Sequence, residues 1–182
     1  MSETTDSPDR SAAIEPTIEP KIRPSIATRI EPVLAELRAR GWDDEQHPLH
    51  VFDDGVRTAA AAAASIGCEV GAIANSLVFD AAGTPVLILT SGAHRVDTVK
   101  TAATIGVPEL GRAAPEFVRE HTGQTIGGVA PLGHPNPIPT YLDTALADYP
   151  EIWAAAGHSH TVFRTTYDEL RDLTGATEIA VE

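Results

Sequence analysis

A glycine- and proline-rich stretch, residues 121–140, is the part of this sequence best suited to hold a ligand in fixed geometry. It contains four glycines and four prolines. Gly127 and Gly128 let the backbone approach a ligand closely, and the prolines stiffen the chain that follows them. Such a loop can present backbone N–H groups to a substrate or to a developing oxyanion. A tight turn before a strand is the alternative, and the glycine pair alone leaves both open.

A metal site is the second chemistry to weigh, because the chain has seven histidines. On a strand, His158 and His160 would place both rings on one face, and His134 would be the third ligand. No carboxylate stands at a matching spacing, and two histidines two residues apart are more often surface or pocket-edge residues. We therefore expect neither a metal nor any other cofactor.

Four other polar side chains have both a structural and a chemical interpretation. Cys68 follows the glycine that ends a helix and has no identifiable base near it, which favours a small buried side chain over a nucleophile. Asp97 is interpreted as a helix cap, and Asp143 as a turn residue at a strand end. Asn75 stands at the entry of an apolar strand, where an amide must find partners, so it either caps a turn or faces a pocket.

The elements that must position these residues are mixed helices and strands. Helices are predicted over residues 26–41, 56–67, 96–106, 114–123 and 166–175, and strands over 47–54, 76–80, 85–91, 140–143, 152–157 and 161–166. Gly83 between two of the strands predicts a hairpin, and Thr166 with Glu169 forms a capping-box pattern. Because strands and helices do not alternate regularly, the predicted fold class is α+β, with a mixed or largely antiparallel sheet.

Composition limits what such a chain can do. Its 182 residues are 42% hydrophobic and carry a formal net charge of −13. This length suits one core, so residues 26–182 are predicted to form a single domain after a disordered tail, residues 1–25, rich in Ser, Thr, Glu and Pro. The charge argues against DNA binding through a broad basic face but leaves a local contact with an RNA end open. No signal-peptide pattern and no apolar run of ~20 residues occurs, so a cytoplasmic protein without a membrane partner is expected.

Six segments together resemble a known family. They are GCEVGAIANSLVF (67–79), PVLILTSGAHRVD (85–97), TGQTIGGVAPLGH (122–134), PIPTYLD (137–143), IWAAAGH (152–158) and TVFRTTYDELRDLTGA (161–176). In this order they resemble the YbaK/prolyl-tRNA synthetase-associated domain family, also called YbaK/EbsC, over residues 58–181. The family includes a free-standing bacterial Cys-tRNA(Pro) deacylase and the editing domain inserted in bacterial prolyl-tRNA synthetases. The resemblance implies a curved, partly barrel-like mixed sheet wrapped by helices.

The resemblance also implies an activity, aminoacyl-tRNA deacylation. The reaction is hydrolysis of the ester that joins a small misacylated amino acid to the terminal adenosine of a tRNA. The implied partners are the tRNA 3′ end, with its aminoacyl-adenosine, and an aminoacyl-tRNA synthetase that assists the contact. A positioned water, or the substrate's own thiol, attacks the carbonyl in this family, and backbone donors stabilise the oxyanion.

Site residues follow from the same resemblance. The residues expected to bind substrate are Ser76, Gly127, Gly128, Gly133, His134, Gly157 and His158. Asn75, the candidate catalytic residue, stands where the family has a functionally important lysine. Because a neutral amide lacks that charge, either Asn75 is a hydrogen-bonding substitute or the chain keeps the pocket as a binding module without the chemistry. His134 or His158, beside the pocket motifs, is the hypothesised source of the missing polarity.

Overall fold

The computed structural model describes residues 22–43 and 45–182. Most of the tail predicted over residues 1–25 lies outside the described residues, and Pro24 and Ser25 form the first turn of a helix. Pro24 suits that position because its ring fixes φ near the helical value and its missing N–H has no helical partner there. No helix within the described ranges is long and apolar enough to cross a bilayer.

Five α-helices and eight strands occur in the described chain. The helices are α1 (Pro24–Ala39), α2 (Ala59–Ile66), α3 (Thr98–Ile105), α4 (Pro115–Thr122) and α5 (Tyr167–Thr174). The strands are β1 (Leu49–Val51), β2 (Ile73–Ala81), β3 (Thr84–Ser91), β4 (Gly111–Arg112), β5 (Thr140–Asp143), β6 (Ile152–Ala155), β7 (Thr161–Thr165) and β8 (Thr177–Ile179). Two 3₁₀ helices, η1 (Val70–Ala72) and η2 (Thr144–Asp148), precede β2 and follow β5. Every predicted helix and strand is present, whereas the very short β4 and β8 were not predicted.

Local sequence signals explain where several elements begin and end. The Asp97 side chain caps α3 by accepting hydrogen bonds from two backbone N–H groups of its first turn. Thr166 and Glu169 form the predicted capping box at the start of α5. Ala82 and Gly83, both with positive φ, make the turn between β2 and β3, so the predicted hairpin is confirmed.

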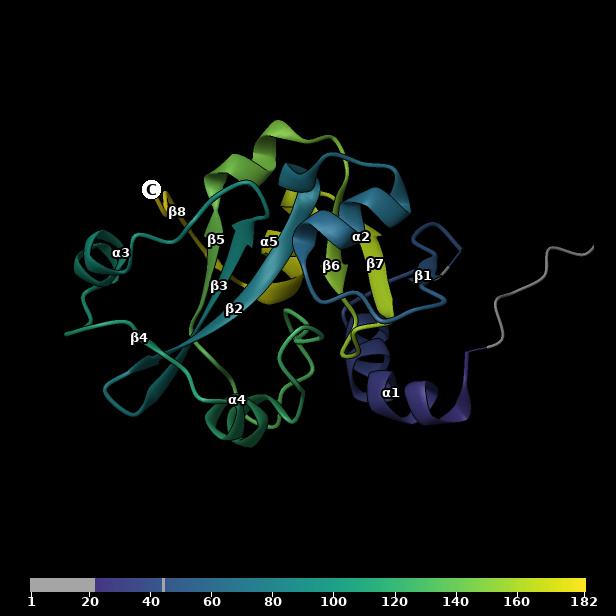
Figure 1. The fold of residues 1–182 in the computed structure, drawn as a ribbon, viewed down its shortest axis with the longest axis horizontal. Helices are drawn as coiled ribbons and strands as arrows, with labels where there is room; N and C mark the ends of the chain where they lie inside the picture. Colours follow the sequence, from purple (N-terminus) through teal and green to yellow (C-terminus); the bar gives the residue numbers. More distant parts are fainter. Residues whose placement is uncertain (1–21, 44) are drawn as a thin grey trace, which may run out of the picture.

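The eight strands form one mixed sheet (Figure 1). Its order is β1-β7-β6-β2-β3-β5-β8, and β4 pairs with β2 beside this path. The pairs β1–β7, β6–β7, β2–β3 and β2–β4 are antiparallel, and β2–β6, β3–β5 and β5–β8 are parallel. The predicted α+β class with a mixed sheet is confirmed. Among the described strands, β1 and β8 remain separate ends, so the sheet is not closed into a barrel.

The two faces of the sheet pack against different helices. On one face, Leu87 of β3 belongs to the largest apolar cluster, which includes residues of α1, α4 and α5. On the opposite face, Ile73 packs under α2 and Ile88 under α3; α2 lies in front of the sheet and α5 behind it in Figure 1. Asn75 and Leu77 lie between these two smaller clusters and belong to neither.

Candidate functional site

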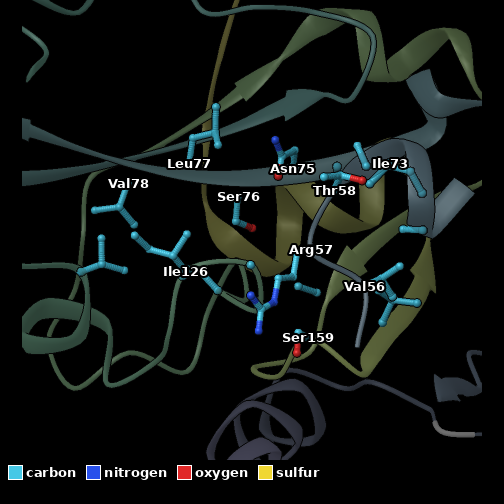
Figure 2. A pocket seen from close by; sticks show the side chains of 18 of the residues that line it. Val56, Arg57, Thr58, Ile73, Asn75, Ser76, Leu77, Val78, Ile126 and Ser159 are labelled. Atoms are coloured by element: carbon cyan, nitrogen blue, oxygen red, sulfur yellow. The ribbon is translucent and has the colours of Figure 1, made fainter. Parts of the chain in front are cut away.

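A cavity of about 590 Å³ opens along β2 (Figure 2). Its walls are β2 itself, residues 56–62 leading into α2, the glycine-rich loop at 126–129 and the turn at 158–159. Of the eight predicted site residues, Asn75, Ser76, Gly127 and His158 line this cavity. Segments far apart in the sequence thus meet at one place.

The strand β2 has a free edge where it faces the cavity. Its pairing with β6 covers only its first two residues, and its pairing with β4 begins at Phe79. Backbone groups alternate in direction along an antiparallel strand. The Gly92 N–H on the β3 side donates to the Ile73 carbonyl at 2.8 Å, so the odd-numbered residues of β2 face β3. The N–H groups of Ser76 and Val78 therefore point to the free edge, within reach of a ligand.

Ser76 carries a buried hydroxyl for which the described chain supplies no hydrogen-bond partner. Figure 2 shows this side chain pointing from β2 into the space in front of Arg57 and Ile126. A buried hydroxyl without a partner costs about 1–3 kcal/mol, which a polar ligand can recover. Successive side chains of a strand point to opposite faces, so Asn75 lies on the face of β2 that carries Leu77. Ser76, rather than Asn75, is directed at the glycine-rich loop.

The glycine pair lets this loop stand close to two walls of the cavity. Gly127 has φ +89°, a conformation that costs side-chain-bearing residues about 1–2 kcal/mol. Its Cα faces Arg57, and a Cβ there would lie 3.8 Å from the Arg57 Cα. A Cβ on Gly128 would lie 2.7 Å from the carbonyl carbon of His158 and from the Ser159 nitrogen. Glycine is therefore required at the first position by φ and at the second by the close approach of backbone.

The charge of the cavity is opposite to that of the whole chain. The sequence holds 26 acidic and 13 basic residues, yet none of the described residues that line the cavity is acidic. The ionisable lining side chains are Arg57, Arg112 and His158. Burial lowers the pKa of His158 from its ordinary 6.5, and His160 and two arginines near the start of α1 lower it further. His158 is thus neutral at pH 7, and arginine supplies the positive charge.

Two predicted site glycines pack against α1 and do not line the cavity. A Cβ on Gly133 would lie 2.9 Å from the Cα of Val33, and one on Gly157 would lie 3.0 Å from the Val33 Cγ2. Both glycines have positive φ, +78° and +98°. They allow α1 to lie directly on the loop and on the turn after β6. The structure gives them a packing role, and their contact with substrate stays a prediction.

His134 also lies outside the cavity lining. Its Nε2 is 2.9 Å from the Ala130 carbonyl oxygen. Burial lowers the pKa of His134, and the bond to Ala130 only partly offsets that effect, so the neutral ring donates its Nε2–H to the carbonyl. The Gln124 side chain accepts from the Ala130 N–H at 2.6 Å. His134 therefore braces the loop from behind, and of the two histidines proposed to supply polarity only His158 reaches the cavity.

The histidine pair, His158 and His160, and Cys68 lie in different surroundings from those of a metal site or a nucleophile. His158 and His160 lie in the turn before β7 rather than on a strand, with ring centroids 4.9 Å apart. Within the described ranges, no three His, Cys, Asp or Glu side chains gather in a group that could hold a metal ion. Burial raises the pKa of the Cys68 thiol, which keeps it protonated, and the side chain packs beneath α2.

A second polar cluster, at the end of β5, has the residue types of a catalytic triad. Asp143 is buried, and its Oδ2 accepts from the Thr90 hydroxyl at 3.1 Å and lies 3.0 Å from the His94 Nδ1. Its Oδ1 accepts from the Ala145 N–H, as expected of a residue that starts η2. The Ser91 hydroxyl donates to a backbone carbonyl at 2.8 Å instead of meeting His94. None of these side chains lines the cavity, so the cluster joins β3 to β5.

Arg57 and Ser159 are cavity residues that the sequence did not reveal. Arg57 directly precedes Thr58, the residue that caps α2, and belongs to no motif. Ser159 lies between His158 and His160, and the sequence pattern there indicated the histidines as candidates but not the serine. The free edge of β2 was also missed, since it depends on which distant strands pair with it. A cationic residue just before a helix cap was the only local signal available.

Residues 53–173 match the family model for the aminoacyl-tRNA editing domain, and the chain belongs to this family. The matched range contains all four walls of the cavity but not α1. The family membership expected from the six sequence segments is thereby confirmed.

Individual relatives agree with this assignment. A crystal structure described as a candidate trans-editing enzyme for prolyl-tRNA synthetase is 42% identical, covers 88% of this chain and 98% of its own, and superposes with a TM-score of 0.79. The Bacillus subtilis protein YwhH is 32% identical over 132 residues, 72% of this chain and 83% of that protein. The proline–tRNA ligases of Thermosipho melanesiensis and Bacillus licheniformis are 30% and 31% identical, and the matches span only 18% and 26% of those enzymes.

Proposed function

We propose that this chain is an aminoacyl-tRNA deacylase, which hydrolyses the ester between a small misacylated amino acid and the 3′-terminal adenosine of a tRNA. The observation that carries the proposal is the buried, unpartnered hydroxyl of Ser76, a residue that lines the cavity, beside the N–H groups at the free edge of β2. Membership of the editing-domain family supports the same reaction.

The chemistry needs only groups that the cavity can supply. A water molecule attacks the ester carbonyl carbon, and the developing oxyanion accepts a hydrogen bond from a backbone N–H at the free edge, such as that of Ser76. The carbon–oxygen bond to the ribose then breaks, the ribose oxygen takes the proton that the attacking water gives up, and the products are the free amino acid and an uncharged tRNA. Fixed backbone donors lower the barrier without a side-chain nucleophile, since they need no reorganisation during the reaction.

The cavity lining favours an amino acid with an uncharged side chain. Apolar residues are frequent in the lining, among them Ile73, Val78 and Val129. Such walls exclude a charged side chain, because burying a charge without a partner is costly. The ester and the ribose are then held by backbone groups, and the amino acid side chain enters the apolar part.

A binding module without catalysis is the second candidate, and Asn75 is the observation that favours it. Asn75 stands where the family has a functional lysine, and its neutral amide replaces a charge-assisted contact worth about 1.5–3 kcal/mol. In this alternative the chain retains the pocket for an aminoacyl-adenosine or a synthetase partner and releases the substrate unchanged.

A deacylation assay separates these candidates. The natural chain and Asn75→Lys are incubated with tRNA(Pro) mischarged with Ala, Ser or Cys, and the loss of the aminoacyl ester is followed. Turnover by the natural chain of at least one substrate supports the deacylase. Turnover gained only in Asn75→Lys establishes the binding module, and no turnover by either variant overturns the deacylase. Ser76→Ala serves as a site control, since it leaves Asn75 untouched and removes the hydroxyl in the cavity.

A further inference from the structure

We propose that Arg57 is the phosphate anchor of the site: its guanidinium binds the phosphate that precedes the terminal adenosine, and so supplies the positive charge that Asn75 lacks. This inference rests on the proposed function, because it places the 3′ end of a nucleic acid in the cavity. Arg57 comes from the segment before α2, not from β2, so the charge enters the cavity from a different wall.

The backbone around Arg57 is fixed on two sides. The Val56 N–H donates to the Ser159 carbonyl at 2.8 Å. A Cβ on Gly55 would lie 2.8 Å from the His160 Cε1, which shows how closely this segment lies on the turn at 158–160. The Arg57 stem lies against Gly127, with a Cβ there placed 3.9 Å from the Arg57 Cγ. The side chain therefore leaves a well-defined point between two walls, which lowers the entropy lost on binding.

The guanidinium itself is unoccupied by protein. In the described chain Arg57 makes no ion pair and no side-chain hydrogen bond, in contrast to Arg40, Arg164 and Arg171, each of which pairs with a carboxylate. Figure 2 shows it in the space between Ser76 and Ser159. The chain has 26 acidic residues, but none of the described residues that line the cavity is acidic. The Arg57 guanidinium can therefore bind an external anion.

A phosphodiester fits this arrangement better than another ligand group would. The planar guanidinium offers parallel N–H donors that match two phosphate oxygens. The Ser76 hydroxyl and the β2 edge lie deeper and suit the uncharged ester. The remaining ionisable lining groups suit the phosphate less well, because His158 is neutral at pH 7 and Arg112 belongs to β4 at the far end of the free edge. Arg112 is thus a matched control, an arginine in the same lining but at the wrong end.

Binding of two probes that cannot be hydrolysed tests the proposal. The first is a fluorescent CCA trinucleotide with alanine joined through an amide to its 3′ end, and the second is the corresponding alanyl-amide adenosine without phosphate. Fluorescence anisotropy and competition give their Kd values for the natural chain, Arg57→Ala, Arg57→Lys and Arg112→Ala. Circular dichroism checks that each variant is folded.

We expect Arg57→Ala to weaken trinucleotide binding about 10- to 100-fold and to change nucleoside binding less than about twofold. The slope of log Kd against log salt should fall by about 0.7, as for one phosphate contact on a single strand. Arg57→Lys should recover part of the affinity, and Arg112→Ala should weaken trinucleotide binding less than Arg57→Ala does. An equal loss on both probes, the same loss in Arg112→Ala, or no trinucleotide binding by the natural chain overturns the proposal.

The two proposals can fail separately. Binding that depends on Arg57, in a chain that turns over no mischarged tRNA, overturns the deacylase and leaves the phosphate anchor. Turnover with a kcat and a KM that Arg57→Ala does not change overturns the anchor and leaves the deacylase.

Discussion

Two polar clusters on the same sheet show why residue types alone do not identify a site. The cluster at Asp143 contains a serine, a histidine and an aspartate, yet the Ser91 hydroxyl donates to a backbone carbonyl, and the carboxylate accepts from backbone and lies beside the His94 Nδ1. At the cavity, Ser76 has neither a histidine nor an aspartate beside it, and its buried hydroxyl has no partner in the described chain. In the first cluster the serine and the carboxylate are already bonded within the protein, whereas the second holds a serine hydroxyl without a partner in the described chain.

The difference teaches that unsatisfied hydrogen-bonding capacity is the better guide. A satisfied network fixes strands relative to one another, and its members serve stability. An unsatisfied buried group weakens the free protein, and it points to a ligand where its residue lines a cavity, as Ser76 does and Thr101, whose buried hydroxyl also has no partner in the described chain, does not. Changes in the first cluster should therefore affect unfolding, and changes in the second should affect binding.

The largest effect on stability is expected from Asp143→Asn. This change removes the charge from a buried carboxylate that both β3 and η2 use as an acceptor. The loss should be about 3 kcal/mol, or roughly 6–12 °C in Tm, as for charged hydrogen bonds inside a protein of this size. Thermal unfolding measures it, and Asp148→Asn at the exposed end of η2 is the control. A Tm equal to that of the control would show that the cluster contributes no stability.

A matched pair of serine substitutions sharpens the comparison. Ser91→Ala removes the donor to the Gly71 carbonyl, leaves that buried acceptor unpaired and should cost about 1–3 kcal/mol. Ser76→Ala removes a buried hydroxyl that has no partner in the described chain, so it should leave stability unchanged or raise it by up to about 1–3 kcal/mol, while the alanyl-amide probes bind more weakly. Urea unfolding gives the free energy of unfolding of both variants, and fluorescence anisotropy gives their Kd values for the probes. If Ser76→Ala unfolds as easily as Ser91→Ala, the hydroxyl is a structural group after all.

The smallest effect concerns pH and the brace behind the loop. Burial lowers the pKa of His134 below its ordinary 6.5, so the unfolded chain binds this proton more readily than the folded chain does. The stabilising contribution is then fully present above pH 6.5 and is lost as the pH falls through the folded pKa. His134→Gln, which keeps a donor for the Ala130 carbonyl but does not titrate, should flatten the fall of Tm between pH 7 and pH 5. An unchanged pH profile would exclude His134 as the source.

Local features of the fold could be predicted from the sequence because their causes are local. The Asp97 cap, the capping box of Thr166 with Glu169 and the turn at Gly83 each depend on residues within one helical or hairpin turn. The glycine pair was likewise recognised as a place of close approach. The neighbours of this glycine pair are Arg57 and the backbone of residues 158–159, which come from distant parts of the chain. The sequence around the glycine pair could not predict them.

The rest of the site depends on pairings that leave no local trace. The free edge of β2 exists because a parallel strand, β6, reaches only its first two residues, and nothing within residues 73–81 records that. Gly133 and Gly157 illustrate the same limit. A glycine in the sequence indicates that another group approaches the backbone closely at that position, but it does not say whether that group belongs to a ligand or to a helix. In this protein the neighbour is Val33 of α1.

The position of α1 has a consequence for how the chain folds during synthesis. Residues 24–39 leave the ribosome early, yet Val33 and Leu37 pack in a cluster that includes Leu132 and Phe163. Contacts between residues roughly a hundred or more positions apart form slowly, because a long loop must close first. Until the second half of the chain has been made, the apolar stripe of α1 has no native partner and is open to chaperones or to aggregation. The helix α1, which is made before the other described helices, is therefore among the last of them that can reach its final place.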